Sequence, residues 1–199
     1  MKKFTLLYLL MCAFLFSRAQ RNFNSILFYS TQSALPFGKG VRLFTDDFHP
    51  GIEVGRTRML QQKENHDWMI QLHVGYFFHR FVQHAVYVDL DMGYRYKIGN
   101  LGIESFLGAG LLQSIPATAK LKLNDTGDYT NNKGIGRLQV SANLGLGLSY
   151  IFRSGSLKDI RFFTRYGQRI QFPFINAYVP LLPYNSFSIG GEWPIHNKK

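Results

Sequence analysis

The sequence predicts an all-β protein whose antiparallel strands close into an up-and-down transmembrane β-barrel. The first observation behind this prediction is the alternation in residues 138–152. Every even position in this segment is apolar or aromatic, and six of the seven odd positions are small or polar. Strands of soluble proteins run about 5–6 residues, whereas about 9–11 residues cross a bilayer at a tilt. An unbroken apolar face of this length is therefore typical of a membrane barrel.

The second observation is that the same period of two recurs along the chain. In each such segment one face is mainly apolar and the other carries small, polar or charged residues. The segments are residues 69–79, 86–97, 101–112, 160–171 and 186–195, and residues 52–60 form a further, less regular strand. A soluble sandwich or lipocalin-like barrel also alternates, but with its apolar residues inside. Here the charges share a face with most in-strand glycines, and aromatic residues gather near strand ends, which favours the membrane form.

Composition is the third observation. Aromatic residues make up 16% of the 199 residues, which excludes a disordered chain, because disordered chains are poor in aromatics. The single cysteine, Cys12, excludes a disulfide scaffold and a cysteine-ligated zinc or iron–sulfur site. Charged residues are only 18% of the chain, below the usual ~25%, and the net charge is +11.

The first residues of the chain have the pattern of a secretory signal peptide. Lys2 and Lys3 precede an apolar run at 4–16, and small residues stand at the −3 and −1 positions of a cleavage site after Ala19. The run is too short to span about 30 Å of hydrocarbon, which argues against a transmembrane anchor. We expect a signal peptide at 1–19 and a barrel domain at 20–199. Cleavage would remove the cysteine and lower the net charge from +11 by three, to +8.

Strand parity sets the number and orientation of the strands. Seven strands are clear in the sequence, and bacterial barrels have an even number, with short periplasmic turns and long outer loops. One more strand between Phe23 and Phe44 gives eight and makes the turns at 98–100 and 153–159 periplasmic. The longest loop, 113–137, then becomes extracellular. Residues 22–48 have no clean period, so a partial plug is the alternative for this segment.

Several segments resemble those of small Gram-negative outer-membrane β-barrel proteins with eight strands. They are the signal ending at Ala19, FHPGIEVG at 48–55, GYRY at 93–96, LGLGLSY at 144–150 and PLLPYNSFSIGGEWPI at 180–195. The resemblance implies a location in the cell outer membrane and brings no known active site. Many such barrels end on an aromatic residue, whereas this chain ends IHNKK.

The charged residues of the predicted inward face are the candidate functional set. They form a lumen charge network of Asp89, Asp91, Arg95, Glu104, Arg161, Arg165, Arg169 and Glu192, joined by Lys97. An eight-stranded barrel is only wide enough for its side chains to fill it, and buried charges must be paired. The sequence therefore predicts a salt-bridged plug, and an open polar channel is the alternative.

Other chemistry has weaker support in the sequence. Ser141 or Ser149 can face inward near His73 or Glu104, as a lipid hydrolase would require, but no motif pairs them. His79 and His84 flank a turn in the manner of metal ligands, although histidines at turns are more often solvated. We expect no catalytic residue, no metal and no cofactor.

These features together predict a structural or interaction protein of the cell envelope, in the form of an accessory subunit of a larger complex. A narrow channel or small-ligand barrel is the alternative, and a lipid-modifying enzyme is the third candidate. The positive charge suits outer-membrane lipids and lipopolysaccharide phosphates as partners. Nucleic acid is not expected, because no basic stripe carries interleaved aromatic residues.

Overall fold

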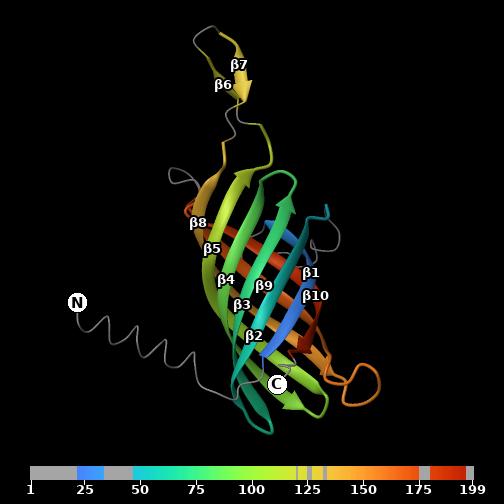
Figure 1. The fold of residues 1–199 in the computed structure, drawn as a ribbon. Coiled ribbons are helices and arrows are strands. Elements are labelled where there is room, and N and C mark those ends of the chain that lie inside the picture. The colour runs from blue at the N-terminus through green and yellow to red at the C-terminus, as the bar shows by residue number, and fades with distance from the viewer. Residues whose placement is uncertain are drawn as a thin grey trace, which may run out of the picture.

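The computed structural model describes residues 22–33, 47–119, 121–124, 127–131, 134–174 and 180–195, in which eight long strands close into one barrel (Figure 1). The predicted signal peptide and its cleavage site lie outside the described residues. The barrel strands are β1 (Asn22–Ser33), β2 (Pro50–Gln62), β3 (His66–His79), β4 (Gln83–Ile98), β5 (Leu101–Pro116), β8 (Arg137–Ile151), β9 (Arg161–Phe172) and β10 (Leu182–Pro194). Two short strands, β6 (Leu121–Leu123) and β7 (Tyr129–Asn131), form a separate hairpin.

Each barrel strand pairs antiparallel with its neighbours, in the order β1-β10-β9-β8-β5-β4-β3-β2. The sheet closes where β1 meets β10, with pairs running from Phe23↔Pro194 to Ser33↔Tyr184. The expected count of eight strands and the up-and-down order are confirmed. Five of the observed strands, β2, β3, β4, β5 and β10, are longer than the predicted segments, because the alternation weakens near the rims while the ladder continues. The other two predicted segments, β8 and β9, are each displaced by one residue.

The first strand is β1, which lies at the start of the irregular segment 22–48. Its described residues pair along both β2 and β10, so they form barrel wall and not a plug. The irregularity has a physical reason: β1 turns Phe23 and Leu27 into the barrel, where both are buried, and places Asn22 and Asn24 on the outward side. Residues 34–46 lie outside the described residues.

The two ends of the barrel differ. At one end, which we call the turn end, residues 63–65, 99–100 and 152–160 connect neighbouring strands, and β1 begins and β10 ends. At the other, the loop end, β5 and β8 are joined by a connection that carries the β6–β7 hairpin. Figure 1 shows this hairpin standing well clear of the barrel. The predicted loop at 113–137 is thus shorter than expected, because β5 continues to Pro116, and it contains ordered strand pairing.

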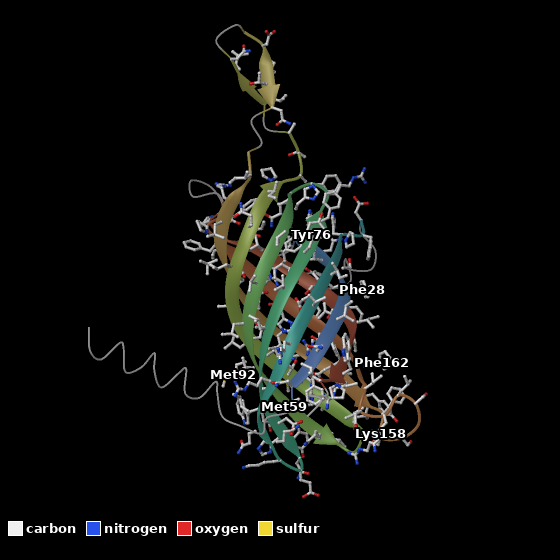
Figure 2. All side chains as sticks on the ribbon, in the orientation of Figure 1. Phe28, Met59, Tyr76, Met92, Lys158 and Phe162 are labelled. Carbon is white, nitrogen blue, oxygen red and sulfur yellow. The ribbon has the colours of Figure 1, made fainter. Side chains whose placement is uncertain are left out.

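The outer surface of the barrel is apolar over most of its height. Phe28, Met92 and Phe162 lie on it (Figure 2), with exposed fractions of 59%, 52% and 48%. On β8, Leu146 is 63% exposed, whereas Ser141 and Ser149 on the other face of the strand are buried, as the alternation predicted. The described residues contain no helix that is long and apolar enough to cross a membrane.

Two apolar clusters lie inside the barrel, one toward each end. Phe77, Ala85, Tyr87, Leu112 and Tyr184 form the cluster near the loop end. Phe77 lies between Tyr76 and Phe78 near the end of β3, but its position in the alternation turns it inward, where it is 2% exposed. The second cluster joins Phe23, Met59 and Met69 near the turn end. Between these clusters the interior is mainly polar and charged, and Leu27, Phe106 and Phe163 lie among the polar side chains.

Candidate functional site

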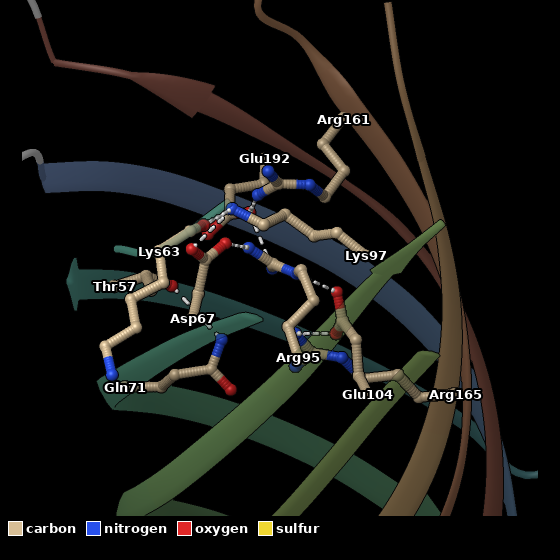
Figure 3. Close-up of polar contacts among 10 residues, drawn as sticks. All are labelled: Thr57, Lys63, Asp67, Gln71, Arg95, Lys97, Glu104, Arg161, Arg165 and Glu192. Atoms are coloured by element: carbon tan, nitrogen blue, oxygen red, sulfur yellow. Dashed lines mark hydrogen bonds and ion pairs between the residues drawn. The ribbon is translucent and has the colours of Figure 1, made fainter. Parts of the chain in front are cut away.

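Arg95 on β4 is the centre of the charge network in the half of the lumen toward the turn end (Figure 3). Its Nε donates to Glu104 Oε1 at 2.7 Å, and one of its terminal nitrogens donates to Glu192 Oε2 at 3.2 Å. The other terminal nitrogen lies 3.9 Å from Asp67 Oδ2. Arg95 is 1% exposed, so all its charge is balanced by carboxylates of β3, β5 and β10.

Two arginines of β9 complete this part of the network. Arg161 donates to Glu192 Oε2, and Arg165 donates to Glu104 Oε2 at 3.2 Å. Glu104 and Glu192 are 3% and 1% exposed. Each of these two carboxylates therefore binds a guanidinium from β4 and another from β9, which ties opposite sides of the barrel together.

Nearer the turn end, Lys97 extends the network toward the rim. Its Nζ lies 2.9 Å from Asp67 Oδ1 and also donates to the Lys63 backbone carbonyl. Gln71 Nε2 donates to Thr57 Oγ1 at 3.2 Å on the neighbouring wall. The acceptors at this rim are thus occupied by residues of the barrel itself.

A second cluster fills the half of the lumen toward the loop end. Arg169 Nη2 donates to Asp89 Oδ2 at 2.5 Å, and its Nε donates to Asn143 Oδ1 at 3.1 Å. Ser141 Oγ donates to the other Asp89 oxygen at 3.1 Å. The Arg169 guanidinium lies 3.6 Å above the Tyr87 ring centroid, a distance typical of a cation–π contact.

Beside this cluster, an acid–histidine chain crosses from β2 to β4. His73 Nδ1 lies 2.9 Å from Glu53 Oε1, and His73 Nε2 lies 3.7 Å from Asp91 Oδ2. Tyr87 donates its hydroxyl hydrogen to Glu53 Oε2 at 2.7 Å. Because that hydrogen is committed to Glu53, Tyr29 donates to Tyr87 across 2.8 Å.

Glutamine side chains close the lumen at the loop end. Gln83 Nε2 donates to Gln171 Oε1 at 2.6 Å and to the Tyr184 hydroxyl at 3.0 Å. Gln171 Nε2 also donates to Gln139, and Ser114 donates to Gln83. All five side chains are buried. Amide groups, which donate and accept together, thus form a neutral layer above the charged ones.

Two glycines of β5 make room for the carboxylates of β4. Gly108 stands opposite Asp91, and Gly110 stands opposite Asp89. A Cβ at either glycine would collide with the facing carboxylate and with a backbone carbonyl of β4. The glycines that share a face with the charges therefore have a steric purpose, as a crowded lumen requires.

The described residues of the barrel line a cavity at the turn end and another within the lumen. A cavity of about 570 Å³ opens at the turn end and is lined in part by Arg95 and Arg161. A smaller one of about 70 Å³ lies within the barrel and is lined in part by Tyr87 and Arg165. Since Arg95 borders the first, Arg165 borders the second and Glu104 binds both arginines, the charge network stands between the two cavities.

All eight residues of the predicted charge network lie on the inner side of the barrel. Seven of them form arginine–carboxylate pairs, while Asp91 faces His73. Asp67, Glu53 and Tyr87 also belong to the network but were not predicted as members. The inward position of Tyr87 could have been predicted, because Tyr87 lies on the same face of β4 as Asp91. Asp67 and Glu53 lie near a strand end and in the least regular of the clear strands, where the period was weak.

The residues considered for catalysis and metal binding have other partners in the structure. Ser141 contacts Asp89 and not His73, whose ring nitrogens face two carboxylates. His84 accepts or donates a bond of 2.8 Å with the outward Tyr76 hydroxyl. Within the described residues, no group of three or more histidine, cysteine or acidic side chains is placed to hold a metal ion.

Comparison with solved structures identifies the architecture. The attachment invasion locus protein Ail of Yersinia pestis shares 12% identity, with 88% of this chain and 99% of that chain covered and a TM-score of 0.51. Neisserial surface protein A shares 7% identity, with 88% and 97% covered and a TM-score of 0.50. The chain has the fold of the small outer-membrane β-barrels. This confirms the fold class predicted from the alternation, and a Gram-negative outer-membrane location goes with that fold.

The likeness to these proteins extends to the fold alone. The outer membrane enzyme PagL also matches, at 12% identity over 87% of this chain and 99% of that chain, but its TM-score of 0.47 carries no argument about activity. No protein-family model matches the chain, and no curated protein matches it in sequence. The orientation expected from strand parity would make the turn end periplasmic and the loop end extracellular.

Proposed function

We propose that this protein is a non-enzymatic outer-membrane barrel whose lumen is closed to ions, and that it acts in the cell envelope as a structural or interaction protein. The observation that carries the proposal is the network around Arg95. Its three carboxylate partners come from three different strands, and a glutamine layer closes the lumen above it. Opening a path would separate buried charges, which costs far more than breaking surface ion pairs.

The part of the molecule that supports an interaction role is the β6–β7 hairpin. Its two strands pair Leu123 with Tyr129 and Leu121 with Asn131, so the two leucines and the tyrosine share one side. Leu121 is 64% exposed, Leu123 is 55% exposed and Tyr129 is 71% exposed. The hairpin stands clear of the barrel (Figure 1). It lies at the loop end, which we expect to be extracellular, where lipid would not shield it. Apolar side chains exposed together in this way are typical of a protein-contact surface.

Conductance in planar bilayers tests the closed lumen. The mature chain is expected to give no steady conductance. The double variant Arg95→Ala/Glu104→Ala, which empties the centre of the network, serves as the positive control for a channel that the assay can detect. A stable, ion-selective open state of the wild-type protein would instead favour the alternative of a narrow channel.

The interaction role is tested on protein purified from native membranes. A partner that depends on the hairpin should be lost from Leu121→Ser/Leu123→Ser/Tyr129→Ser and retained by Thr130→Ala, which changes the opposite side of β7. Retention by both variants would contradict the role of the hairpin. Mass spectrometry of lipid A from a deletion strain addresses the enzyme candidate, and we expect no change in it.

A further inference from the structure

The outer wall of the barrel carries two charged residues, and both belong to β2. Arg56 and Arg58 alternate with Gly55, Thr57 and Met59, which face the lumen, so the two arginines point outward. Every other aspartate, glutamate, lysine or arginine within the described barrel strands is on the inner side of its strand. The charge that these strands place on the outer wall is therefore positive and gathered at one place.

Two asparagines extend this charged place into a patch. Arg58 stands opposite Asn22 in the β1–β2 ladder, and Arg56 stands opposite Asn24. Because side chains of directly opposed residues lie on the same face of a sheet, all four project from the outer wall side by side. We call these four residues, Asn22, Asn24, Arg56 and Arg58, the β1–β2 patch.

Aromatic residues fix the height of the β1–β2 patch in the membrane. Trp193 stands opposite Asn24 on its β10 side, and Trp68 lies two residues before Ile70, the β3 partner of Arg58. Trp193 and Trp68 are 39% and 38% exposed on the outer wall near the turn end. Tryptophan in this position marks the interface between hydrocarbon and headgroups, so the β1–β2 patch lies at the periplasmic interface.

The chemistry of the β1–β2 patch fits a phosphate group. A lipid-facing arginine is costly at the bilayer midplane, but near an interface its long side chain reaches the headgroups. Guanidinium forks bind phosphate oxygens bidentately, and asparagine amides add neutral donors. The patch therefore combines two positive charges with amide donors at the depth where lipid phosphates lie.

We propose that the β1–β2 patch is a binding site for the headgroup phosphate of an anionic phospholipid in the periplasmic leaflet. Arg56 and Arg58 bind the phosphate, and Asn22 and Asn24 donate from the neighbouring strand. The site lies on the outer wall and uses none of the lumen residues, so it holds whether or not the lumen conducts ions. The bound phospholipid would contact both β1 and β2, and it would come from the periplasmic leaflet and not from the outer leaflet.

Native mass spectrometry of the mature protein, released from vesicles of phosphatidylcholine and phosphatidylglycerol, tests this site. The wild type should retain phosphatidylglycerol in preference to phosphatidylcholine. In Arg56→Gln/Arg58→Gln the retention should fall on the order of tenfold, since each basic residue near an anionic leaflet adds to the attraction. The matched control is Arg153→Gln/Lys158→Gln, which removes two exposed cations from the β8–β9 turn at the same end. This control should keep the preference.

Three results would overturn the proposal. The first is a wild-type protein that retains both lipids equally. The second is an equal loss of phosphatidylglycerol in the patch variant and the turn control, which would show a general effect of charge. The third is a wild-type protein that is dimeric, with a patch variant that is monomeric and a turn control that is still dimeric. This result would show that the β1–β2 patch binds a second copy of the chain. Heat-resistant migration on gels checks that each variant is folded before it is compared.

Discussion

Glu104 accepts hydrogen bonds from two arginines at once, with Oε1 2.7 Å from Arg95 Nε and Oε2 3.2 Å from Arg165 Nη2. Arg95 belongs to β4 and Arg165 to β9, so a single carboxylate on β5 joins strands that are not neighbours in the sheet. The ladder of backbone hydrogen bonds holds adjacent strands only. Contacts of this kind therefore resist a different motion, the flattening of the barrel across its width.

Replacing the Glu104 carboxylate should strongly reduce the free energy of unfolding. Glu104→Gln keeps the shape of the side chain but leaves two buried guanidinium groups without its charge, and breaking a buried pair costs about 3–5 kcal/mol. The free energy of unfolding in urea, measured in phospholipid vesicles, should fall by that amount. Adding Arg165→Gln should restore part of the loss, because it removes one of the uncompensated charges. A loss below about 1 kcal/mol for Glu104→Gln would contradict the importance of the pair.

Substitution of Leu146 by arginine tests whether the outer wall of the barrel faces lipid. It is 63% exposed on the outer wall, and an arginine at a lipid-facing site costs about 2–4 kcal/mol near the midplane and about 0–1 kcal/mol near an interface. Leu146→Arg should therefore reduce the stability in bilayers far more than Tyr150→Arg, which lies on the same face of β8 near the turn end. Equal costs would contradict the depth assigned to these residues. Folding of the mature chain as a monomer in plain buffer would contradict the membrane assignment itself.

The glycines opposite the carboxylates should tolerate little change. A Cβ at Gly108 would lie 2.5 Å from the Leu90 carbonyl oxygen, and that backbone cannot yield without breaking the ladder. A Cβ at Gly147 would lie 2.9 Å from Arg165 Cγ, which belongs to a flexible side chain, and 3.0 Å from the Thr164 carbonyl oxygen. Gly108→Ala is expected to cost about 1–3 kcal/mol of unfolding free energy, and Gly147→Ser less. The reverse order would show that the lumen is more adaptable at β4 than at β9.

The orientation can be checked on whole cells. A cysteine introduced by Asn131→Cys lies on the β6–β7 hairpin and should react with an impermeant maleimide without permeabilisation. A cysteine introduced by Lys158→Cys lies in the β8–β9 turn and should react only after the outer membrane is opened. The chain's own Cys12 falls within the predicted signal peptide, so the processed protein has no competing thiol. The opposite labelling pattern would reverse the topology.

Acid should weaken the extracellular rim through His49. Its side chain is 2% exposed and stacks on His79 with ring centroids 3.8 Å apart, and burial lowers the pKa of His49 below the ordinary value of 6.5 despite nearby Asp47. Below about pH 6.5 the unfolded chain binds a proton that the folded protein resists, so the free energy of unfolding should decrease as the pH falls. The slope per proton is at most about 1.4 kcal/mol per pH unit.

Comparison with His49→Gln isolates this contribution. The variant should lose part of the decrease between pH 7 and pH 5. Unfolding in urea at several pH values measures both proteins in the same way. Parallel pH profiles for the wild type and the variant would rule out His49 as the source.

Much of the barrel was predictable from the sequence, because a period of two has a direct physical meaning in a strand. The alternation of the fifteen residues of β8 is enough to assign both of its faces, and that of β4 places Asp89, Asp91 and Arg95 on one side. The pattern could not be read in β1, where the inward Phe23 is apolar and the outward Asn24 is polar. That inversion places Asn24 beside Arg56, and the β1–β2 patch is therefore what obscured the strand.

The pairing of the charges was beyond the sequence for a different reason. The alternation predicts which residues face the lumen. It does not predict the position of each residue along the barrel axis or the side chain that it meets across the lumen. Asp91 was grouped with the arginines, yet it faces His73 of the adjacent strand, while Asp89 reaches Arg169 across the lumen. These partners depend on the register between each strand and the next around the closed sheet. The sequence of a single strand does not determine that register.

The closure of the sheet by β1 and β10 sets a condition on how the molecule can form. The pair Phe23↔Pro194 joins residues near opposite ends of the described chain, so β1 needs a partner strand that is synthesised long after it. Loop-closure entropy makes contacts so distant in sequence slow to form, and until they form both terminal strands present bare edges. The protein must therefore travel to its membrane as an unfolded chain, shielded from its own exposed strands, and complete its fold only on arrival.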